Sequence, residues 1–221
     1  MYNIAIDGPA GAGKSTIARK VAAELGFVYV DTGAMYRAMA YYFLQHDISS
    51  EDQQTVEAAC PDIRVTIEYQ DGEQQVLLNG ENVNAYIRTE QVSLMTSKVS
   101  QYPKVREKLV SLQKQLAAEQ NVIMDGRDIG TCVLPDADAK IYLTASVKER
   151  ATRRYKEQIE KGMQADLSEI EADIEKRDYQ DMHREVSPLC QAEDAVLVDS
   201  SDMTIREVVE EIIRIFEEKK A

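Results

Sequence analysis

The feature that most constrains this chain is a glycine-rich loop between a strand pattern and a helix pattern. An apolar run at residues 2–6 precedes the loop, and Ile17, Val21 and Leu25 recur at four-residue spacing after it, until Gly26. The loop fits the pattern G-x-x-x-x-G-K-[ST] in full, with Gly8, Pro9, Ala10, Gly11, Ala12, Gly13, Lys14 and Ser15. Strand, loop and helix in this order predict a polyphosphate-binding loop.

The chemistry of the loop explains the residue types at each position. Glycines let successive backbone N–H groups turn inward around an anion, and the helix that follows points its positive end at the same anion. Lys14 adds a point charge for the β and γ phosphates, and the Ser15 hydroxyl can ligate Mg²⁺. The alternative, a chance glycine turn that caps a helix, is disfavoured because both flanking elements are present.

A loop of this kind indicates a nucleoside triphosphate, and three classes of protein use one: small-molecule kinases, GTPase switches and mechanical ATPases. The guanine-reading string Asn-Lys-x-Asp does not occur in the sequence, which disfavours the GTPase class. The net charge of −13 argues against binding to nucleic acid or to an anionic membrane surface.

The remaining composition points to the cytoplasm, and we expect in addition a monomer with small-molecule partners. The sequence has no apolar run long enough to span a membrane, and residues 1–7 lack the basic start and apolar core of a secretion signal. Its cysteines are three in number and widely spaced, as expected for free thiols in a reducing compartment. With two histidines and no close cysteine pair, a zinc site is not expected.

Strand and helix patterns alternate along most of the chain, which predicts a parallel α/β sheet. Five strands are expected, at residues 2–6, 27–30, 121–124, 140–143 and 195–198. Residues 62–84 break this rhythm with two alternating runs on either side of Asp71-Gly72, so we expect a small antiparallel hairpin insert there. Helices are expected at 89–119, divided by Pro103, and at 147–184, interrupted by Gly162; the last begins with a capping box of Thr204 and Glu207.

Charged residues follow two of the predicted strands directly. The second strand leads into the segment from Asp31 to Arg37, and the third leads into the segment from Asp125 to Gly130. Ligands of open α/β sheets bind beyond the carboxyl ends of the strands, where Arg37 and Arg127 can fork onto a phosphate. A strand-end Asp such as Asp125 can hold a magnesium-bound water. The alternatives are a solvated helix arginine for Arg37 and a charged surface loop for Arg127.

The charged region 147–184 holds further arginines. Three of them fall at helical spacing on one face: Arg150, Arg153 and Arg154. Arg177 and Arg184 share another face if their helix is continuous, with Asp181 between them. These side chains suit a lid over ATP because a guanidinium keeps its proton; the alternative is pairing with the many nearby glutamates.

Taken together, these strings resemble the bacterial cytidylate kinases, which are nucleoside monophosphate (NMP) kinases. The matching strings span nearly the whole chain: IDGPAGAGKST (6–16), DTGAMYR (31–37), IRTEQVS (87–93), VRE (105–107), DGRDIGT (125–131) and KRDYQDMHREVSPL (176–189). The hairpin at Asp71-Gly72 matches the β insert of the longer bacterial members. The chain departs from some members at Ser15-Thr16, where they have Gly-Thr, and at Thr32, where they have Ser.

The resemblance implies a P-loop NMP kinase fold of the α/β class, with a five-stranded parallel sheet flanked by helices. It also implies three domains: a core of residues 1–36, 118–150 and 186–221, an NMP-binding domain of residues 37–117 that holds the β insert at 62–84, and a helical lid at 151–185. The implied reaction is ATP + CMP ⇌ ADP + CDP, with dCMP also accepted and Mg²⁺ as cofactor.

The resemblance also assigns site residues. ATP is expected on Gly8, Pro9, Ala10, Gly11, Ala12, Gly13, Lys14, Ser15 and Thr16, with Ser15 on Mg²⁺ and Asp125 holding its water. The acceptor phosphate is expected on Arg37, Arg127 and Arg184, the sugar on Arg177 and Asp181, and cytosine on Ser97, Arg106 and Asp128. Thr32 is expected to bind the substrate through its hydroxyl. The transferring phosphate is expected to meet Lys14, Arg127, Arg150, Arg154 and Arg184.

Two rival functions remain open from the sequence. One is another small-molecule P-loop kinase that acts on UMP, AMP or a hydroxyl substrate. The other is a nucleotide-dependent binding or switch protein without turnover, which would bind ATP and phosphorylate no monophosphate. ADP release measured across the nucleoside monophosphates distinguishes the kinase specificities, and ATP binding without turnover identifies the switch protein.

Overall fold

The computed structural model describes residues 1–220 and divides the chain into two compact units. The phosphate-loop unit consists of residues 1–29 and everything from Gln120 onward, and the insert unit consists of Val30–Glu119. None of the helices in the described residues is long and apolar enough to cross a membrane.

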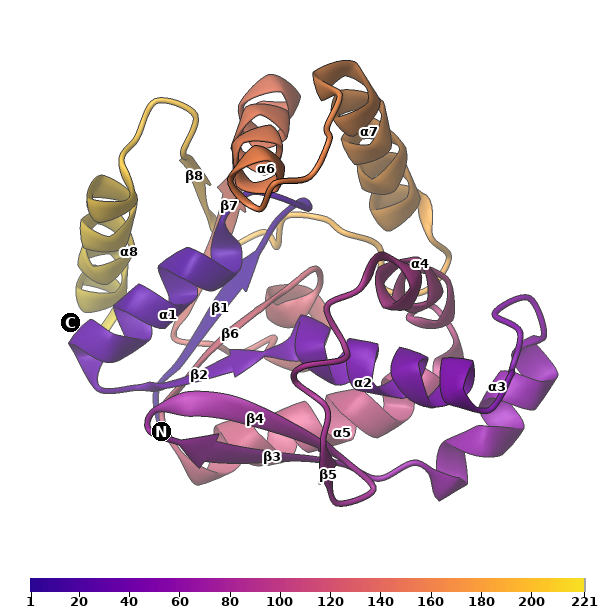
Figure 1. Cartoon of the computed structure of the whole chain (residues 1–221). Coiled ribbons are helices and arrows are strands. Elements are labelled where there is room, and N and C mark those ends of the chain that lie inside the picture. The colour runs from indigo at the N-terminus through magenta and orange to yellow at the C-terminus, as the bar shows by residue number, and fades with distance from the viewer. Residues whose placement is uncertain (221) are drawn as a thin grey trace. The chain divides into compact units, whose positions relative to one another are not determined.

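A five-stranded parallel sheet, in the order β2-β6-β1-β7-β8, confirms the predicted strands and fold class (Figure 1). The central β1 (Asn3–Asp7) pairs on one side with β6 (Val122–Gly126) and on the other with β7 (Ala139–Thr144). The edges are formed by β2 (Val28–Asp31) and by β8 (Val196–Asp199), which pairs with β7. The phosphate loop and the Asp125–Gly130 segment both follow carboxyl ends of neighbouring strands, as parallel pairing requires.

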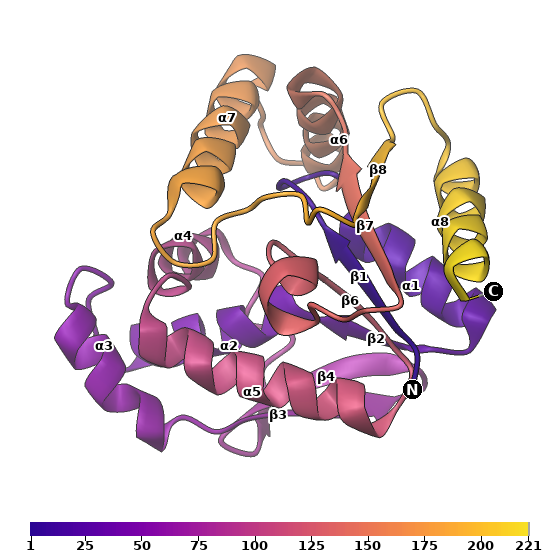
Figure 2. The same ribbon diagram turned by 180° about the vertical axis from the view of Figure 1, so that it is seen from behind.

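Helices α1 (Lys14–Leu25) and α8 (Ile205–Lys220) lie side by side against this sheet (Figures 1 and 2). Their apolar stripes close a core with the strands, formed among others by Ile4, Ile6, Ile17, Val21, Ile212 and Phe216. The predicted capping box opens α8, because Glu207 accepts from the backbone N–H of Thr204 at 2.7 Å and its own N–H donates to the Thr204 hydroxyl at 3.3 Å.

A second pair of helices in the same unit is α6 (Val147–Glu160) and α7 (Leu167–His183), which pack on one another through Ala151, Ile170 and Ile174 (Figure 2). Gly162 lies in the turn between them with a left-handed φ of 73°, as the predicted interruption requires. Arg177 and Arg184 do not share a helix face, because the condition of a continuous helix is not met: α7 ends at His183, and Arg184 is its extended C-cap residue. Pro188 follows the cap, and a helix does not continue into such a segment.

A single π-helical turn, Ile129–Val133, follows β6 and was not predicted. Five residues leave too little periodicity for a sequence pattern to reveal. Its first two amides donate to Asp7 rather than to the preceding turn.

The insert unit begins with α2 (Thr32–Gln45), α3 (Gln53–Ala59) and a 3-10 turn at Cys60–Asp62. The predicted hairpin is present as β3 (Val65–Gln70) and β4 (Glu73–Leu78), joined at Asp71-Gly72 with φ of 53° and 80°. A third strand, β5 (Glu81–Asn82), was missed because two residues are too few to show alternation. The unit ends with α4 (Glu90–Val99) and α5 (Pro103–Glu119), divided at Pro103 as predicted.

Candidate active site

The phosphate loop has the backbone conformation that its glycines predict. Gly8, Gly11 and Gly13 have φ of 148°, 76° and 86°, where a side chain is strained. At Gly8 a Cβ would stand 2.0 Å from the carbonyl oxygen of Leu143, so the neighbouring strand also excludes any other residue. Gly13 is the N-cap residue of α1, which places the positive end of that helix at the loop.

Lys14 curls back over the loop that precedes it. Its buried Nζ donates to the carbonyl oxygen of Pro9 at 2.8 Å. The pKa of Lys14 is lowered to about 7, mainly by burial and secondly by the positive charge of Arg127. The carboxylates of Asp125 and Asp7 act in the opposite direction. A polyphosphate in the loop would supply the negative charge that restores the ammonium form.

Asp125, at the carboxyl end of β6, is buried and accepts two hydroxyl hydrogen bonds. The donors are Ser15 Oγ at 2.9 Å and the Tyr29 hydroxyl at 2.8 Å. Tyr29 was missed by sequence reasoning, because an aromatic residue inside a buried strand reads as core. A hydroxyl and a carboxylate oxygen beside a phosphate loop are the ligands that Mg²⁺ takes in nucleotide sites, so the residues present fit this ion.

Asp7 was also missed, although its place at the end of the first strand, just before the loop, was a usable signal. Its carboxylate accepts from the backbone N–H groups of Ile129 at 2.8 Å and Gly130 at 2.7 Å. Burial raises the pKa of Asp7 to about 6, while these two N–H donors oppose the rise. The π-helical turn is thereby tied to the strand that carries the phosphate loop.

Arginines and carboxylates from α7 and from the segments that follow β6 and α7 form one cluster. Arg127 Nε donates to Asp181 Oδ2 at 2.7 Å, and Arg184 Nη2 lies 3.5 Å from Asp128 Oδ1. Burial disfavours the charge on Asp181, but Arg127, then Arg177 and Arg184, hold its pKa below the usual value. Five predicted site residues far apart in sequence are thus brought together.

Arg150 and Arg153 both reach the glycine loop from α6. The buried Arg150 guanidinium donates to the carbonyl oxygens of Ala145 and Ala10, both at 2.9 Å, and to Asp178 Oδ2 at 2.6 Å. Arg153 donates to the Ser200 carbonyl oxygen at 2.8 Å, and its Nη1 lies 4.0 Å from the Cβ position of Gly13. These contacts assign Arg150 a role in shaping the loop.

Arg154, the remaining arginine of the predicted lid face, is exposed on α6. Its place one residue after Arg153 puts it on the same helix.

The insert unit holds a second group of predicted residues, centred on the start of α2. Asp31 caps this helix, because its Oδ1 accepts from the Ala34 N–H at 2.9 Å while its Oδ2 pairs with Arg88 at 3.0 Å. Thr32 is buried directly after it. The guanidinium of Arg37 lies over Gly33, with Nη1 3.1 Å from where a Cβ would stand, so a side chain here would have to displace the Arg37 guanidinium.

Arg106 and Ser97 belong to the two helices that follow the insert. Arg106 is buried on α5; its Nη1 donates to the Ser100 carbonyl oxygen at 3.3 Å, and its guanidinium carbon lies 5.8 Å from the centre of the Tyr36 ring. Ser97 is half-buried on α4. Arg106 is therefore a fixed cation within the insert unit, and α2 contributes the aromatic ring beneath it.

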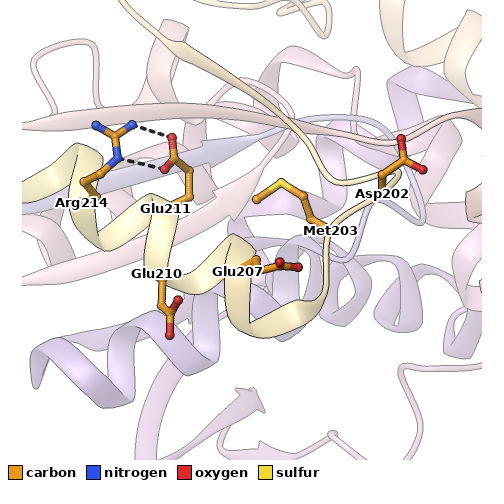
Figure 3. Close-up of a pocket in the computed structure, with 6 residues that line it drawn as sticks. All are labelled: Asp202, Met203, Glu207, Glu210, Glu211 and Arg214. Atoms are coloured by element: carbon orange, nitrogen blue, oxygen red, sulfur yellow. Dashed lines mark hydrogen bonds and ion pairs between the residues drawn. The ribbon is translucent and has the colours of Figure 1, made fainter.

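A shallow pocket at the start of α8 involves none of these residues (Figure 3). It is lined by Asp202, Met203, Glu207, Glu210, Glu211 and Arg214. Arg214 is engaged by both carboxylate oxygens of Glu211, at 2.9 and 2.6 Å. Four carboxylates in the lining do not suit a phosphate, so this pocket is not a nucleotide site.

Comparison with known proteins now adds to this geometry. The family model described as cytidylate kinase matches residues 4–218. The chain belongs to the cytidylate kinase family. It is 52% identical to a cytidylate kinase of Alkaliphilus metalliredigens, over 98% of this chain and 97% of the relative. It is 50% identical to one of Ligilactobacillus salivarius, over 98% and 96%, and 48% identical to one of Enterococcus faecalis, over 98% and 96%.

Solved structures support the fold of this family member at much lower identity. A shikimate kinase from Bacteroides thetaiotaomicron aligns over 98% of both chains, with a TM-score of 0.50 and 13% identity. A gluconokinase from Sinorhizobium meliloti aligns over 98% of this chain and 92% of its own, with a TM-score of 0.50 and 12% identity. At this identity the likeness concerns the P-loop kinase fold alone.

Proposed function

We propose that this protein transfers the γ-phosphoryl group of ATP to CMP, giving ADP and CDP. The observation that carries the proposal is the phosphate loop with its buried Lys14 in the same unit as the cluster of Arg127, Asp128, Asp181 and Arg184. A chain that belongs to the cytidylate kinase family and has this arrangement is equipped to hold two phosphorylated substrates.

The chemistry asks for charge stabilisation and alignment. The attacking atom is a phosphate oxygen that is already anionic at neutral pH, so a general base is not required. Lys14 and the N-terminus of α1 neutralise the donor phosphates, and Arg127 and Arg184 neutralise the acceptor phosphate. Their pairing with Asp181 and Asp128 keeps these guanidiniums oriented before CMP arrives.

The acceptor residues divide by the part of CMP that each suits. Thr32 and Arg37 join Arg127 and Arg184 on the phosphate, Arg177 and Asp181 bind the sugar hydroxyls, and Ser97, Arg106 and Asp128 read cytosine. Asp128 can accept from the cytosine amino group, whereas a uracil carbonyl would meet it acceptor to acceptor. We propose dCMP as a second substrate, as the resemblance to the cytidylate kinases implies.

Mg²⁺ would be held by Ser15 Oγ directly and by Asp125 through water, and it would supply positive charge between the β and γ phosphates. The Ser15 hydroxyl donates a hydrogen bond to Asp125 Oδ2, with 2.9 Å between the two oxygens, so Asp125 already orients the oxygen that would face the ion. Arg150 and Arg154 both belong to α6 and are proposed to meet the transferring phosphate. Arg150 ends the proposed core segment 118–150, and Arg154 lies in the proposed lid, residues 151–185, which would exclude water from that phosphate.

The proposed domains follow the same division of labour: a core of 1–36, 118–150 and 186–221, and an NMP-binding domain of 37–117. The protein is proposed to act as a cytoplasmic monomer, in line with its three free thiols at Cys60, Cys132 and Cys190. Light scattering of the purified protein measures the oligomeric state.

A coupled assay of ADP release tests the proposed function. ATP and Mg²⁺ are supplied with CMP, dCMP, UMP, AMP, gluconate or shikimate in turn. We expect turnover with CMP and dCMP, and at least tenfold weaker kcat/KM with the others. Fastest turnover with UMP, AMP or a hydroxyl substrate would favour the rival kinase, and ATP binding without turnover would favour a switch protein.

The Asp128→Ala variant tests how cytosine is recognised. Loss of the carboxylate removes the acceptor for the cytosine amino group, so the preference for CMP over UMP should fall by about tenfold or more, the range of a lost polar contact. The ratio of the two kcat/KM values measures this. An unchanged ratio would remove Asp128 from the base site.

A further inference from the structure

The β insert makes one contact that the proposed chemistry does not explain. Gln74, on β4, reaches Asp31 at the end of β2 with both ends of its side-chain amide. The Asp31 N–H donates to Gln74 Oε1 at 2.9 Å, and Gln74 Nε2 donates to the Asp31 carbonyl oxygen at 3.2 Å. The amide therefore pairs with the backbone of Asp31 as the peptide group of another strand would.

The position of Asp31 explains why such a partner is needed. β2 is an edge strand of the five-stranded sheet, and the N–H and C=O of one strand residue point to the same side. The backbone N–H and C=O of Asp31 both face Gln74 in the β insert. Asp31 is buried, and a buried backbone group without a partner is costly. A primary amide is the one side-chain group that presents a donor and an acceptor at matching spacing.

Gln74 is itself held in place from both sides. Its backbone pairs with Tyr69 on β3, and its carbonyl oxygen accepts from Asn84 Nδ2 at 2.8 Å. Asn84 Oδ1 accepts in turn from the Val76 N–H at 2.9 Å, where the two-residue β5 is too short to continue the ladder. The amide of Gln74 is thus presented by a rigid hairpin.

Asp31 joins this hairpin to the start of α2. Its carboxylate caps α2 through the Ala34 N–H and pairs with Arg88, whose segment leads into α4. Thr32 follows Asp31 directly, and the Arg37 guanidinium lies over Gly33 next to Asp31 Oδ1. Any shift of Asp31 therefore moves the two residues proposed for the acceptor phosphate.

We propose that Gln74 is a positioning residue for the acceptor phosphate: by completing the backbone pairing of Asp31, it fixes the first turn of α2 and hence Thr32 and Arg37. This gives the β insert a role in binding CMP without a direct contact to it. The inference rests on the proposed function, since it concerns the acceptor side of that reaction.

The experiment compares Gln74→Met with the control Gln70→Met. Met has nearly the length of Gln and removes both hydrogen bonds; Gln70 is an exposed residue of β3 in the same hairpin. We expect Gln74→Met to raise KM for CMP about tenfold, because misplacement of binding groups by a fraction of an ångström is costly. KM for ATP should stay within about twofold, since the phosphate loop does not depend on Asp31, and the control should match the wild type.

Gln74→Glu sharpens the test. It replaces the donor with an acceptor that faces the Asp31 carbonyl oxygen, so its KM for CMP should exceed that of Gln74→Met. A lower melting temperature with KM for CMP unchanged would mean that Gln74 serves stability alone and would overturn the proposal.

A measurement on the unsubstituted protein covers the case in which both variants unfold. The Asp31 amide should exchange its hydrogen slowly, as slowly as amides paired within the β ladder, and fast exchange would overturn the proposal. The two proposals fail separately: wild-type protein that does not phosphorylate CMP defeats the proposed function, whereas wild-type activity together with an unaffected Gln74→Met defeats only this inference.

Discussion

Arginine–carboxylate pairs occur in two places in the phosphate-loop unit, between α6 and α7 near the loop and along α8, but their surroundings differ. Between α6 and α7, the Arg150–Asp178 pair has side chains 4% and 12% exposed. On α8, the Arg206–Glu210 pair has side chains 88% and 58% exposed, with a similar N–O distance of 2.7 Å against 2.6 Å. The two ion pairs thus have nearly the same N–O distance, but one is buried and the other is exposed to solvent.

This difference separates two uses of the same chemistry. A buried pair loses the hydration of both ions, so it adds little net stability, and removing one partner leaves a charge that neither water nor protein balances. An exposed pair keeps its hydration and is screened by salt. The buried pairs next to the glycine loop therefore serve to hold guanidiniums in fixed orientations, and the α8 pairs serve solubility.

The largest effect is expected from breaking the buried pair. Asp178→Ala leaves the Arg150 guanidinium buried without its carboxylate, and this should lower the free energy of unfolding by about 3–5 kcal/mol. Urea denaturation measures the change. Glu210→Ala on α8 is the matched control, and an equal loss in both variants would abolish the distinction between the two helices.

The next effect concerns activity. Arg127→Met removes a guanidinium that is bonded to Asp181 and close to Lys14, and kcat should fall by about 100- to 1,000-fold, as when a single preorganised donor is lost. Steady-state assays with CMP and ATP measure this. If Arg127 only stabilised the fold, kcat per folded molecule would stay at the wild-type value while the urea midpoint fell.

These two predictions depend on contacts that the sequence revealed unequally. The glycine loop, the five strands and the arginine-bearing segments could be predicted because each carries a local pattern: a motif, an apolar run or a turn signal. Tyr29 and Gln74 could not, because each acts through a partner more than 40 residues away and lies in a segment whose own pattern is that of an ordinary strand. Asp7 was missed although its place just before the loop was a signal, because its partners lie in a π-helical turn that the sequence did not reveal. The same limit applied to Arg184, whose place outside α7 depends on how the chain leaves that helix.

A third prediction concerns Lys14, a buried cation whose hydrogen-bond partner is a neutral carbonyl group. Its pKa of about 7 lies below the usual 10.5, so as the pH falls from 10.5 toward 7 the unfolded chain binds this proton and the folded chain does not. The free energy of unfolding is therefore highest, as far as Lys14 is concerned, above pH 10.5, and it decreases as the pH falls to about 7. ATP, by adding negative charge, should raise the pKa again.

Proton uptake on ATP binding follows from this shift. With a pKa of about 7, Lys14 is about 90% neutral at pH 8 before ATP binds, and it is charged once ATP is bound. Binding at pH 8 should therefore take up close to one proton per ATP. Calorimetric titrations in two buffers of different ionisation enthalpy measure the number of protons. The Lys14→Met variant should show little uptake, and equal uptake by the two proteins would assign the proton to another group.

The smallest effect is expected on α8, and it tests the other side of the comparison. Arg206→Gln removes a pair that is open to solvent, so the melting temperature should stay at the wild-type value, and so should kcat and KM for CMP and ATP. Thermal unfolding at low and at 1 M salt measures this, since any small loss should vanish at high salt. A clear destabilisation that persists at 1 M salt would mean that short distance alone gives an ion pair its strength. In that case the burial of Arg150 and Asp178 would no longer explain why the pair between α6 and α7, and not the pairs on α8, holds an arginine at the glycine loop.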